Sequence, residues 1–259
     1  MKSNRLAFCL TILFLLPAAA LLSRFRTDSD IIISDRVMLR HVCDSVYVHV
    51  TRDSLRSYGW FSSNGMVVVK NGRALLVDTP MDDTKTAVLV TYLRDFMHVY
   101  VDCVIVSHFH DDCLGGLNYI HRSGIPSFCG SRTADICRDS GLPVCSSVFC
   151  DSMQFSFQGL TIICRFFGAG HTRDNIVTLI PEKQVLFGGC LIRAAEAQGL
   201  GNLSDACVEQ WENTVQRVKA LYGEVAVVIP GHGMYGGPEL LDHTVGLVQA
   251  YVRAHREHK

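Results

Sequence analysis

Short apolar segments recur along the chain, and between some of them apolar residues return every three or four positions. Apolar or alternating runs of about four to eight residues are typical of strands, whereas the three-to-four spacing is typical of amphipathic helices. The pattern predicts strands over residues 46–50, 66–70, 74–77, 101–106, 153–157, 160–166, 176–180, 185–187 and 225–229. It predicts helices over residues 82–96, 205–221 and 238–255.

The order of these segments predicts how the fold is layered. Asn71 and Gly72 separate two of the strands, and this pair supplies the positive φ angles of a tight hairpin turn. Each half of the chain begins with a run of strands and ends with a strand–helix–strand unit. This repeated order favours two packed sheets with helices outside. We therefore expect an α/β protein, an αββα sandwich formed as a single domain by residues 24–259.

Residues 1–23 are typical of a secretory signal peptide. Lys2 and Arg5 precede an apolar run over residues 6–22, which ends close to the small residues at 18–20. A membrane anchor is the alternative, because about 17–25 apolar residues span a bilayer. The small residues before Ser23 favour cleavage, so we expect a periplasmic protein with no stable membrane anchor.

Charge and composition exclude other classes of protein. The chain has 25 acidic and 24 basic residues and no recurring basic stripe, so a nucleic-acid partner is not expected. Hydrophobic residues make up 48% and charged residues 19%, which excludes an intrinsically disordered chain. Most of the 11 cysteines are expected to be small buried side chains, and the sequence does not identify a partner for any disulfide.

Residues suited to metal binding follow several of the predicted strands. The ends of strands are the usual place for sites in α/β sheets, so these side chains are expected to converge: His108, His110, Asp112, His171, Cys190 and His232. Imidazole, thiolate and carboxylate are ligands that zinc takes in proteins. The other histidines are expected to be ordinary core or surface residues.

The motifs that contain these residues resemble the metal-binding motifs of the metallo-β-lactamases, and in particular of the di-zinc subclass B1. They are His108-x-His110-x-Asp112, Gly170-His171-Thr172, Gly188-Gly189-Cys190 and Pro230-Gly231-His232. Cys190 stands where the wider superfamily of hydrolases usually has a bridging aspartate. Cys113 and the segment 201–206 are similar to Bacteroides-type enzymes. The resemblance covers nearly all of the chain from about residue 46.

This resemblance implies two zinc ions per chain. His108, His110 and His171 would hold the first zinc, and Asp112, Cys190 and His232 would hold the second. A zinc-bound hydroxide would attack the carbonyl of a β-lactam ring, with Asp112 orienting the hydroxide.

The resemblance also implies residues that act on the substrate. Asn202 would bind the substrate and hold the oxyanion, and Arg193 would grip the substrate carboxylate; the alternative for Arg193 is an ordinary surface cation. Trp60 and Phe61 would cover the substrate from a hairpin flap about two residues shorter than usual, unless they lie tucked onto the sheet edge. Buried Asp78 would brace the loop that carries the first two histidines.

The function expected from these features is zinc-dependent hydrolysis of penicillins, cephalosporins and carbapenems by a monomeric enzyme, which gives antibiotic resistance. A related hydrolase acting on lactones or thioesters is the alternative, and Cys190 disfavours it. A zinc-binding or thiol-redox protein without catalysis is a third reading, which the cysteines suggest.

Overall fold

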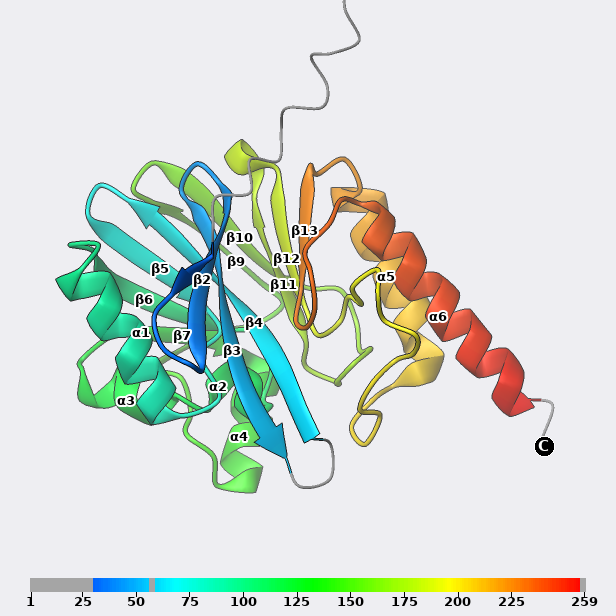
Figure 1. Ribbon diagram of the computed structural model, residues 1–259. Helices are drawn as coiled ribbons and strands as arrows, with labels where there is room; N and C mark the ends of the chain where they lie inside the picture. The colour runs from blue at the N-terminus through cyan, green and yellow to red at the C-terminus, as the bar shows by residue number, and fades with distance from the viewer. Residues whose placement is uncertain (1–29, 56–58, 257–259) are drawn as a thin grey trace, which may run out of the picture.

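Two β-sheets lie face to face with helices on both outer sides in the computed structural model, which describes residues 30–55 and 59–256 (Figure 1). The first sheet follows sequence order: β1 (Ile31–Ile32), β2 (Val37–Cys43), β3 (Val46–Leu55), β4 (Gly59–Lys70), β5 (Arg73–Val77), β6 (Tyr100–Val106), β7 (Ser127–Gly130) and β8 (Ser147–Phe149). The second has the order β13 (Val227–Pro230), β12 (Val185–Gly189), β11 (Ile176–Ile180), β10 (Leu160–Phe166) and β9 (Ser152–Phe157). The expected αββα sandwich is confirmed.

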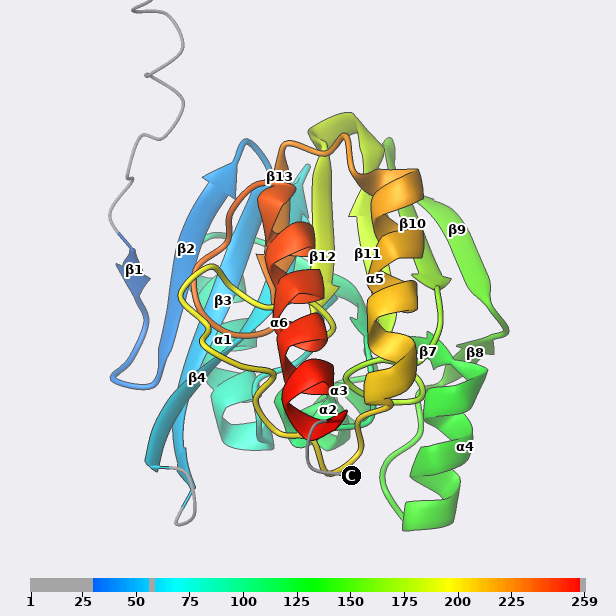
Figure 2. The same ribbon diagram turned by 90° about the vertical axis from the view of Figure 1, so that its right-hand side faces the viewer.

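The helices divide between the two outer faces. The first sheet is covered by α1 (Asp83–Asp95), α3 (Leu117–Arg122) and α4 (Ser131–Ser140), with the short α2 (Asp111–Leu114) after β6. Figure 2 shows α5 (Val208–Tyr222) and α6 (Glu239–Arg256) side by side over the second sheet. A short 3₁₀ helix, Pro181–Lys183, connects β11 to β12.

Three apolar layers hold the sandwich together. Met66, Ile105 and Phe187 belong to the layer between the sheets, and each is fully buried. Leu89 lies in the layer under α1, and Trp211 lies in the layer under α5 and α6. Burying a large apolar side chain contributes about 1.5–3 kcal/mol, so these layers fix how the two sheets pack.

Most of the predicted elements are present. Asn71 and Gly72 have φ angles of 52° and 71°, as the predicted hairpin requires. Helix α1 begins after Asp82, whose side chain caps it by accepting from the backbone N–H of Lys85 at 2.7 Å. Helix α5 begins later than expected, at Val208, and the preceding segment forms a loop. The sequence prediction missed β1, β2, β7, β8 and helices α2, α3 and α4.

The ten cysteines among the described residues are all free thiols, and seven of them are buried. The expectation that most of them are small core side chains is confirmed. In the part of the chain that the structure describes, no helix has the length and apolar character needed to cross a bilayer. The signal peptide expected over residues 1–23 lies outside the described residues.

A buried histidine sits against a glycine in β4. His49 is fully buried, its Nε2 lies 3.1 Å from the carbonyl oxygen of Asp78, and burial lowers its pKa to about 4. A Cβ on Gly65 would overlap Nε2 of His49 and lie 2.7 Å from the carbonyl oxygen of Val77. The backbone of β4 therefore has no room for a side chain at this position.

We expect Gly65→Ala to lower the free energy of unfolding by about 3 kcal/mol, the upper end of the usual cost of overpacking. Gly246→Ala is the matched control, because Gly246 is exposed within α6 and a Cβ there meets nothing within 4 Å. The control should raise stability by about 1 kcal/mol through helix propensity. Chemical denaturation of both variants measures the difference, and equal stabilities would contradict the packing described.

Candidate metal centre

The residues expected to bind metal all lie at one end of the sandwich. His108, His110 and Asp112 follow β6 of the first sheet. His171 precedes β11, and Cys190 and His232 follow β12 and β13, all in the second sheet. A hydrogen bond of 2.9 Å from the backbone N–H of Ile176 to the carbonyl oxygen of Ser107 joins the two sheets at this end. Each sheet therefore contributes half of the candidate ligands.

Three imidazole rings form the first cluster. Nδ1 of His110 lies 3.2 Å from Nε2 of His108 and 3.2 Å from Nε2 of His171. The three rings meet edge to face, with centroids 4.8–5.0 Å apart. A nitrogen from each ring is thus directed toward one shared point, an arrangement that suits a zinc ion.

A thiol, a carboxylate and an imidazole form the second cluster. Sγ of Cys190 lies 3.5 Å from Oδ2 of Asp112 and 3.4 Å from Nε2 of His232. Oδ2 of Asp112 lies 3.2 Å from the same nitrogen of His232. The structure therefore brings together all six residues that the sequence singled out.

Cys113 adds a donor that was not among the expected ligands. Its Sγ lies 3.3 Å from Nδ1 of His108, and donor atoms of His108, Asp112, Cys113 and Cys190 all lie within 4.8 Å of one another. Two thiols consequently face each other at the second cluster.

The pKa shifts of the candidate ligands indicate which of them must lose a proton before a divalent cation can bind. Burial lowers the pKa of His171 to about 3, so its imidazole is neutral. A hydrogen bond from Cys113 holds the pKa of Cys190 well below its usual value despite burial, and the charge of His232 adds to the effect. Burial raises the pKa of Cys113, which stays a thiol. Burial works to lower the pKa of His108 and of His232, but contacts with Cys190 and Asp112 outweigh it and raise the first to about 9 and the second well above its usual value. These two imidazoles would therefore each release a proton when zinc binds. Neutral imidazole, thiolate and carboxylate are the forms in which such side chains bind zinc, so the residue types present fit this metal.

A chain of hydrogen bonds through Ser107 to Asp78 orients the imidazole ring of His108. Nδ1 of His108 lies 3.1 Å from Oγ of Ser107, which donates to Asp78 at 2.7 Å. Asp78 also accepts from the backbone N–H of Ser107 at 2.6 Å, and it is fully buried. The predicted bracing role of Asp78 is therefore confirmed.

Asp205 is an orienting residue that the sequence analysis missed. Its Oδ2 lies 3.0 Å from Nε2 of His110, the ring nitrogen that points away from the cluster. Burial raises the pKa of Asp205, but hydrogen bonds from His110 and Ser204 outweigh it and leave the pKa lowered. Only its position three residues after Asn202 could have drawn attention to it. The contact keeps His110 in the tautomer that presents Nδ1 to the cluster.

Comparison with known proteins identifies the family. The metallo-beta-lactamase superfamily matches over residues 58–133. A metallo-beta-lactamase type 2 of Bacteroides fragilis is 40% identical over 222 residues, which cover 86% of this chain and 89% of that protein. The chain belongs to the metallo-β-lactamase family. The family resemblance and the enzyme class expected from the sequence are thus confirmed.

Solved metallo-β-lactamases share the fold over most of the chain. One from Pontibacter korlensis has a TM-score of 0.80 at 30% identity and covers 83% of this chain and 99% of that one. The metallo-beta-lactamase FIM-1 from Pseudomonas aeruginosa, in a mono-zinc form, has a TM-score of 0.78 at 30% identity. The match covers 85% of this chain and 98% of that one. The use of a metal follows from the family and from the donor clusters of this chain.

Arg193 and Asn202 lie at the two ends of one loop of the metallo-β-lactamase domain. Nε of Arg193 donates to the carbonyl oxygen of Gly199 at 3.1 Å, and a Cβ on Gly201 would lie 3.1 Å from its Nη1. Asn202 is exposed, and its Oδ1 accepts from the backbone N–H of Ser204 at 3.1 Å. The amide N–H groups of Asn202 are its remaining donors. The loop continues to Asp205 at the first cluster, so it runs from Arg193 to the metal centre.

Trp60 and Phe61 lie on the extended β3–β4 hairpin. The ring centroid of Phe61 is 6.4 Å from that of His232. Trp60 is 66% exposed, and the guanidinium of Arg36 lies 4.4 Å from its ring centroid. Trp60 is therefore largely exposed and contacts Arg36, and Phe61 is the side chain of the pair that faces His232. The turn at residues 56–58 lies outside the described residues.

We expect Asp205→Ala to weaken zinc binding about 10- to 100-fold, the usual effect of losing a group that orients a ligand. Competition between the protein and a chromophoric chelator measures this affinity. Asp139→Ala is the control, because Asp139 is an exposed carboxylate on α4. Equal affinities in the two variants would show that Asp205 does not orient His110.

Proposed function

We propose that this chain hydrolyses β-lactams with zinc held at the two donor clusters. The observation that carries the proposal is the convergence of three imidazoles beside a carboxylate, a thiolate and a fourth imidazole. Family membership supports the same chemistry, because the similar proteins are named metallo-beta-lactamases.

The proposed ligand sets follow the two clusters. The first zinc would be held by His108, His110 and His171, and the second by Asp112, Cys190 and His232, as in subclass B1. When bound, zinc supplies a Lewis acid for the carbonyl and lowers the pKa of a coordinated water to about 7.

The chain's own residues would position and stabilise the substrate. The amide N–H of Asn202 would donate to the oxygen that becomes negative as the ring opens, which is where preorganised donors contribute most. The guanidinium of Arg193 would bind the carboxylate that bicyclic β-lactams carry, through two parallel hydrogen bonds. Oδ2 of Asp112, which faces Cys190 and His232, would orient the attacking water or accept a proton from it. Trp60 and Phe61 would cover the substrate.

Further properties belong to the same proposal. The chain would carry two zinc ions, act as a monomer, and reach the periplasm after removal of residues 1–23, leaving residues 24–259 as one domain. Its substrates would include penicillins, cephalosporins and carbapenems, so the cell would gain resistance to them.

The test is the ring opening of a carbapenem and a cephalosporin by the purified mature protein, followed by absorbance. Hydrolysis that a chelator abolishes and added zinc restores would support the proposal, with zinc content measured in parallel. Zinc-loaded protein that is inert toward both would contradict it. Activity on lactones or thioesters in the same assay would then favour the related hydrolase, and zinc binding without any turnover would favour the non-catalytic protein.

A further inference from the structure

Three cysteines gather at the edge of the first sheet, outside the two donor clusters. Cys129 lies in β7, Cys137 lies in α4, and Cys145 lies in the segment that leads into β8. All three are buried in the apolar layer on the outer face of this sheet. Figure 2 shows α4 beside β7 and β8. We call these three residues the thiol cluster.

Paired serines hold the segment before β8 against β7. The backbone N–H of Ser127 donates to Oγ of Ser146 at 2.9 Å, and the backbone N–H of Ser146 donates to Oγ of Ser127 at 2.9 Å. Side chains two residues apart in a strand point to the same face, so the sulfur of Cys129 lies on the same face of β7 as Oγ of Ser127. Cys145, the residue before Ser146, is therefore held close to Cys129.

The sulfurs of Cys129 and Cys145 are in contact. The thiol of Cys145 donates a hydrogen bond to the sulfur of Cys129, as does the backbone N–H of Cys145, and together they lower the pKa of Cys129 although burial opposes them. The same contact, with burial, raises the pKa of Cys145. Burial is the main cause that raises the pKa of Cys137 to about 11, and Cys129 affects it only through its charge. Cys129 and Cys145 are thus the natural pair, with Cys129 the one that ionises first.

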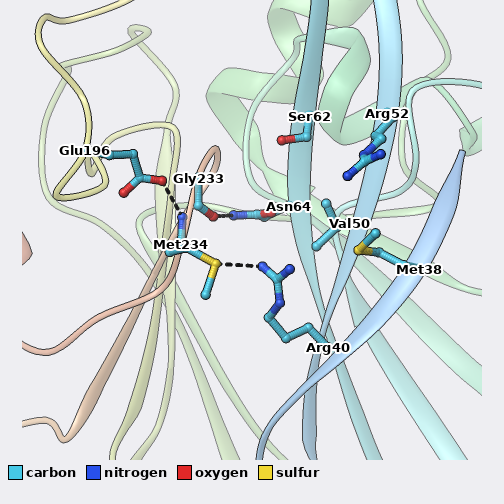
Figure 3. A pocket seen from close by; sticks show the side chains of 9 residues that line it. All are labelled: Met38, Arg40, Val50, Arg52, Ser62, Asn64, Glu196, Gly233 and Met234. Atoms are coloured by element: carbon cyan, nitrogen blue, oxygen red, sulfur yellow. Dashed lines mark hydrogen bonds between the residues drawn. The ribbon is translucent and has the colours of Figure 1, made fainter. Parts of the chain in front are cut away.

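A bond between these two sulfurs would close a loop over residues 129–145. The loop contains α4 and ends two residues before β8, which is three residues long and the last strand of its sheet. So short an edge strand has few hydrogen bonds of its own to hold it. Cavities of about 290 and 150 Å³ open beside the β3–β4 hairpin, and no cysteine lines either of them (Figure 3). The bond would therefore act on the stability of the sheet edge.

We propose that Cys129 and Cys145 form a disulfide that fastens α4 and β8 to β7 when the chain folds in the presence of a disulfide oxidant. The proposal goes beyond the proposed function, because the fold alone defines the pair. Disulfides are typical of proteins in oxidising compartments such as the periplasm. A disulfide stabilises the folded state mainly by restricting the unfolded chain.

The exchange takes two steps and consumes one molecule of the oxidant. The thiolate of Cys129 attacks the disulfide of oxidised glutathione and releases one glutathione thiol. Cys145 loses its proton and attacks the sulfur of Cys129 in this mixed disulfide, which releases the second glutathione. The protein thus loses two hydrogens, and two glutathione thiols are formed. Both sulfurs are buried in the folded chain, so the exchange takes place before α4 packs on β7.

The test is a map of the disulfides after refolding. Reduced, unfolded protein is refolded with zinc and a mixture of oxidised and reduced glutathione, and free thiols are then blocked with iodoacetamide. Trypsin cuts after Arg132 and Arg138 and chymotrypsin cuts after Phe149, so the cysteines of the thiol cluster fall in separate fragments. Mass spectrometry without reductant should show the fragment with Cys129 joined to the fragment with Cys145. The midpoint of thermal unfolding should lie about 5 °C above that of protein refolded with a phosphine reductant.

Cys145→Ser should lose both the cross-link and the difference in unfolding midpoint. Cys150→Ser is the matched control, because Cys150 is exposed and nearby in sequence, and this variant should keep both. Iodoacetamide on both Cys129 and Cys145 of the refolded wild type, or a link from Cys129 to Cys137, would overturn the proposal. The map of the wild type decides the matter even if Cys145→Ser does not fold, and it requires no hydrolytic activity.

Discussion

Cys190→Ser is expected to lower kcat/KM for β-lactams by more than about 100-fold. Loss of a group that only hydrogen-bonds to a metal ligand already lowers metal affinity or activity by about 10- to 100-fold. Sγ of Cys190 lies within 3.5 Å of both Asp112 and His232. Serine replaces a buried thiolate, which is a strong zinc ligand, with a hydroxyl that stays protonated at neutral pH. The variant should hold less zinc per chain, measured by atomic absorption after dialysis.

Cys150→Ser is the control for the loss of a thiol, because Cys150 is exposed and lies outside the clusters. It should keep the zinc content and turnover of the wild type. Normal activity and normal zinc content in Cys190→Ser would contradict the proposed second ligand set.

Oxidised glutathione is expected to join Cys113 and Cys190 in a disulfide when the metal has been removed. The two sulfurs lie within 4.8 Å of each other, and side-chain rotation must bring them to about 2.05 Å. The thiolate of Cys190 attacks the disulfide of glutathione and releases one glutathione thiol. The thiol of Cys113 then displaces the second glutathione, so the protein loses two hydrogens and two glutathione molecules are formed.

The expected result is a cross-linked pair of peptides in mass spectrometry and a large loss of zinc rebinding, which a thiol reductant reverses. Protein loaded with zinc before oxidation should resist the reaction, because a metal-bound thiolate is withheld from attack. Cys113→Ser should rebind zinc after the glutathione adduct on Cys190 is reduced, and it should never give the cross-link. An oxidised, metal-free wild type without this cross-link would disprove the pairing.

The sequence predicted long buried elements well and short ones poorly. The apolar run at residues 101–106 and the Asn71–Gly72 turn carry strong local signals, and both have the expected structure. Strands β7 and β8 are four and three residues long, too short for a period to be recognised. Helix α5 starts late where Asp205 is held by His110. That contact spans 95 residues of sequence, so local periodicity carries no information about it.

The same distinction applies to the metal centre. The six ligand candidates were predictable because each stands in a short motif at the end of a strand. The contact of Asp205 with His110 depends on how separate loops pack. The contact of Cys113 with His108 lies within one segment and depends on how the chain turns into α2.

The division of the candidate ligands between the two sheets would make a bound metal a brace between the two halves of the sandwich. His108, His110 and Asp112 come from one sheet and His171, Cys190 and His232 from the other, so each cluster bridges the sandwich at its open end. A ligand that binds only the folded state stabilises it in proportion to its concentration and affinity. If zinc binds as proposed, scarcity of the metal would therefore shorten the lifetime of the folded chain against proteases as well as lower its activity.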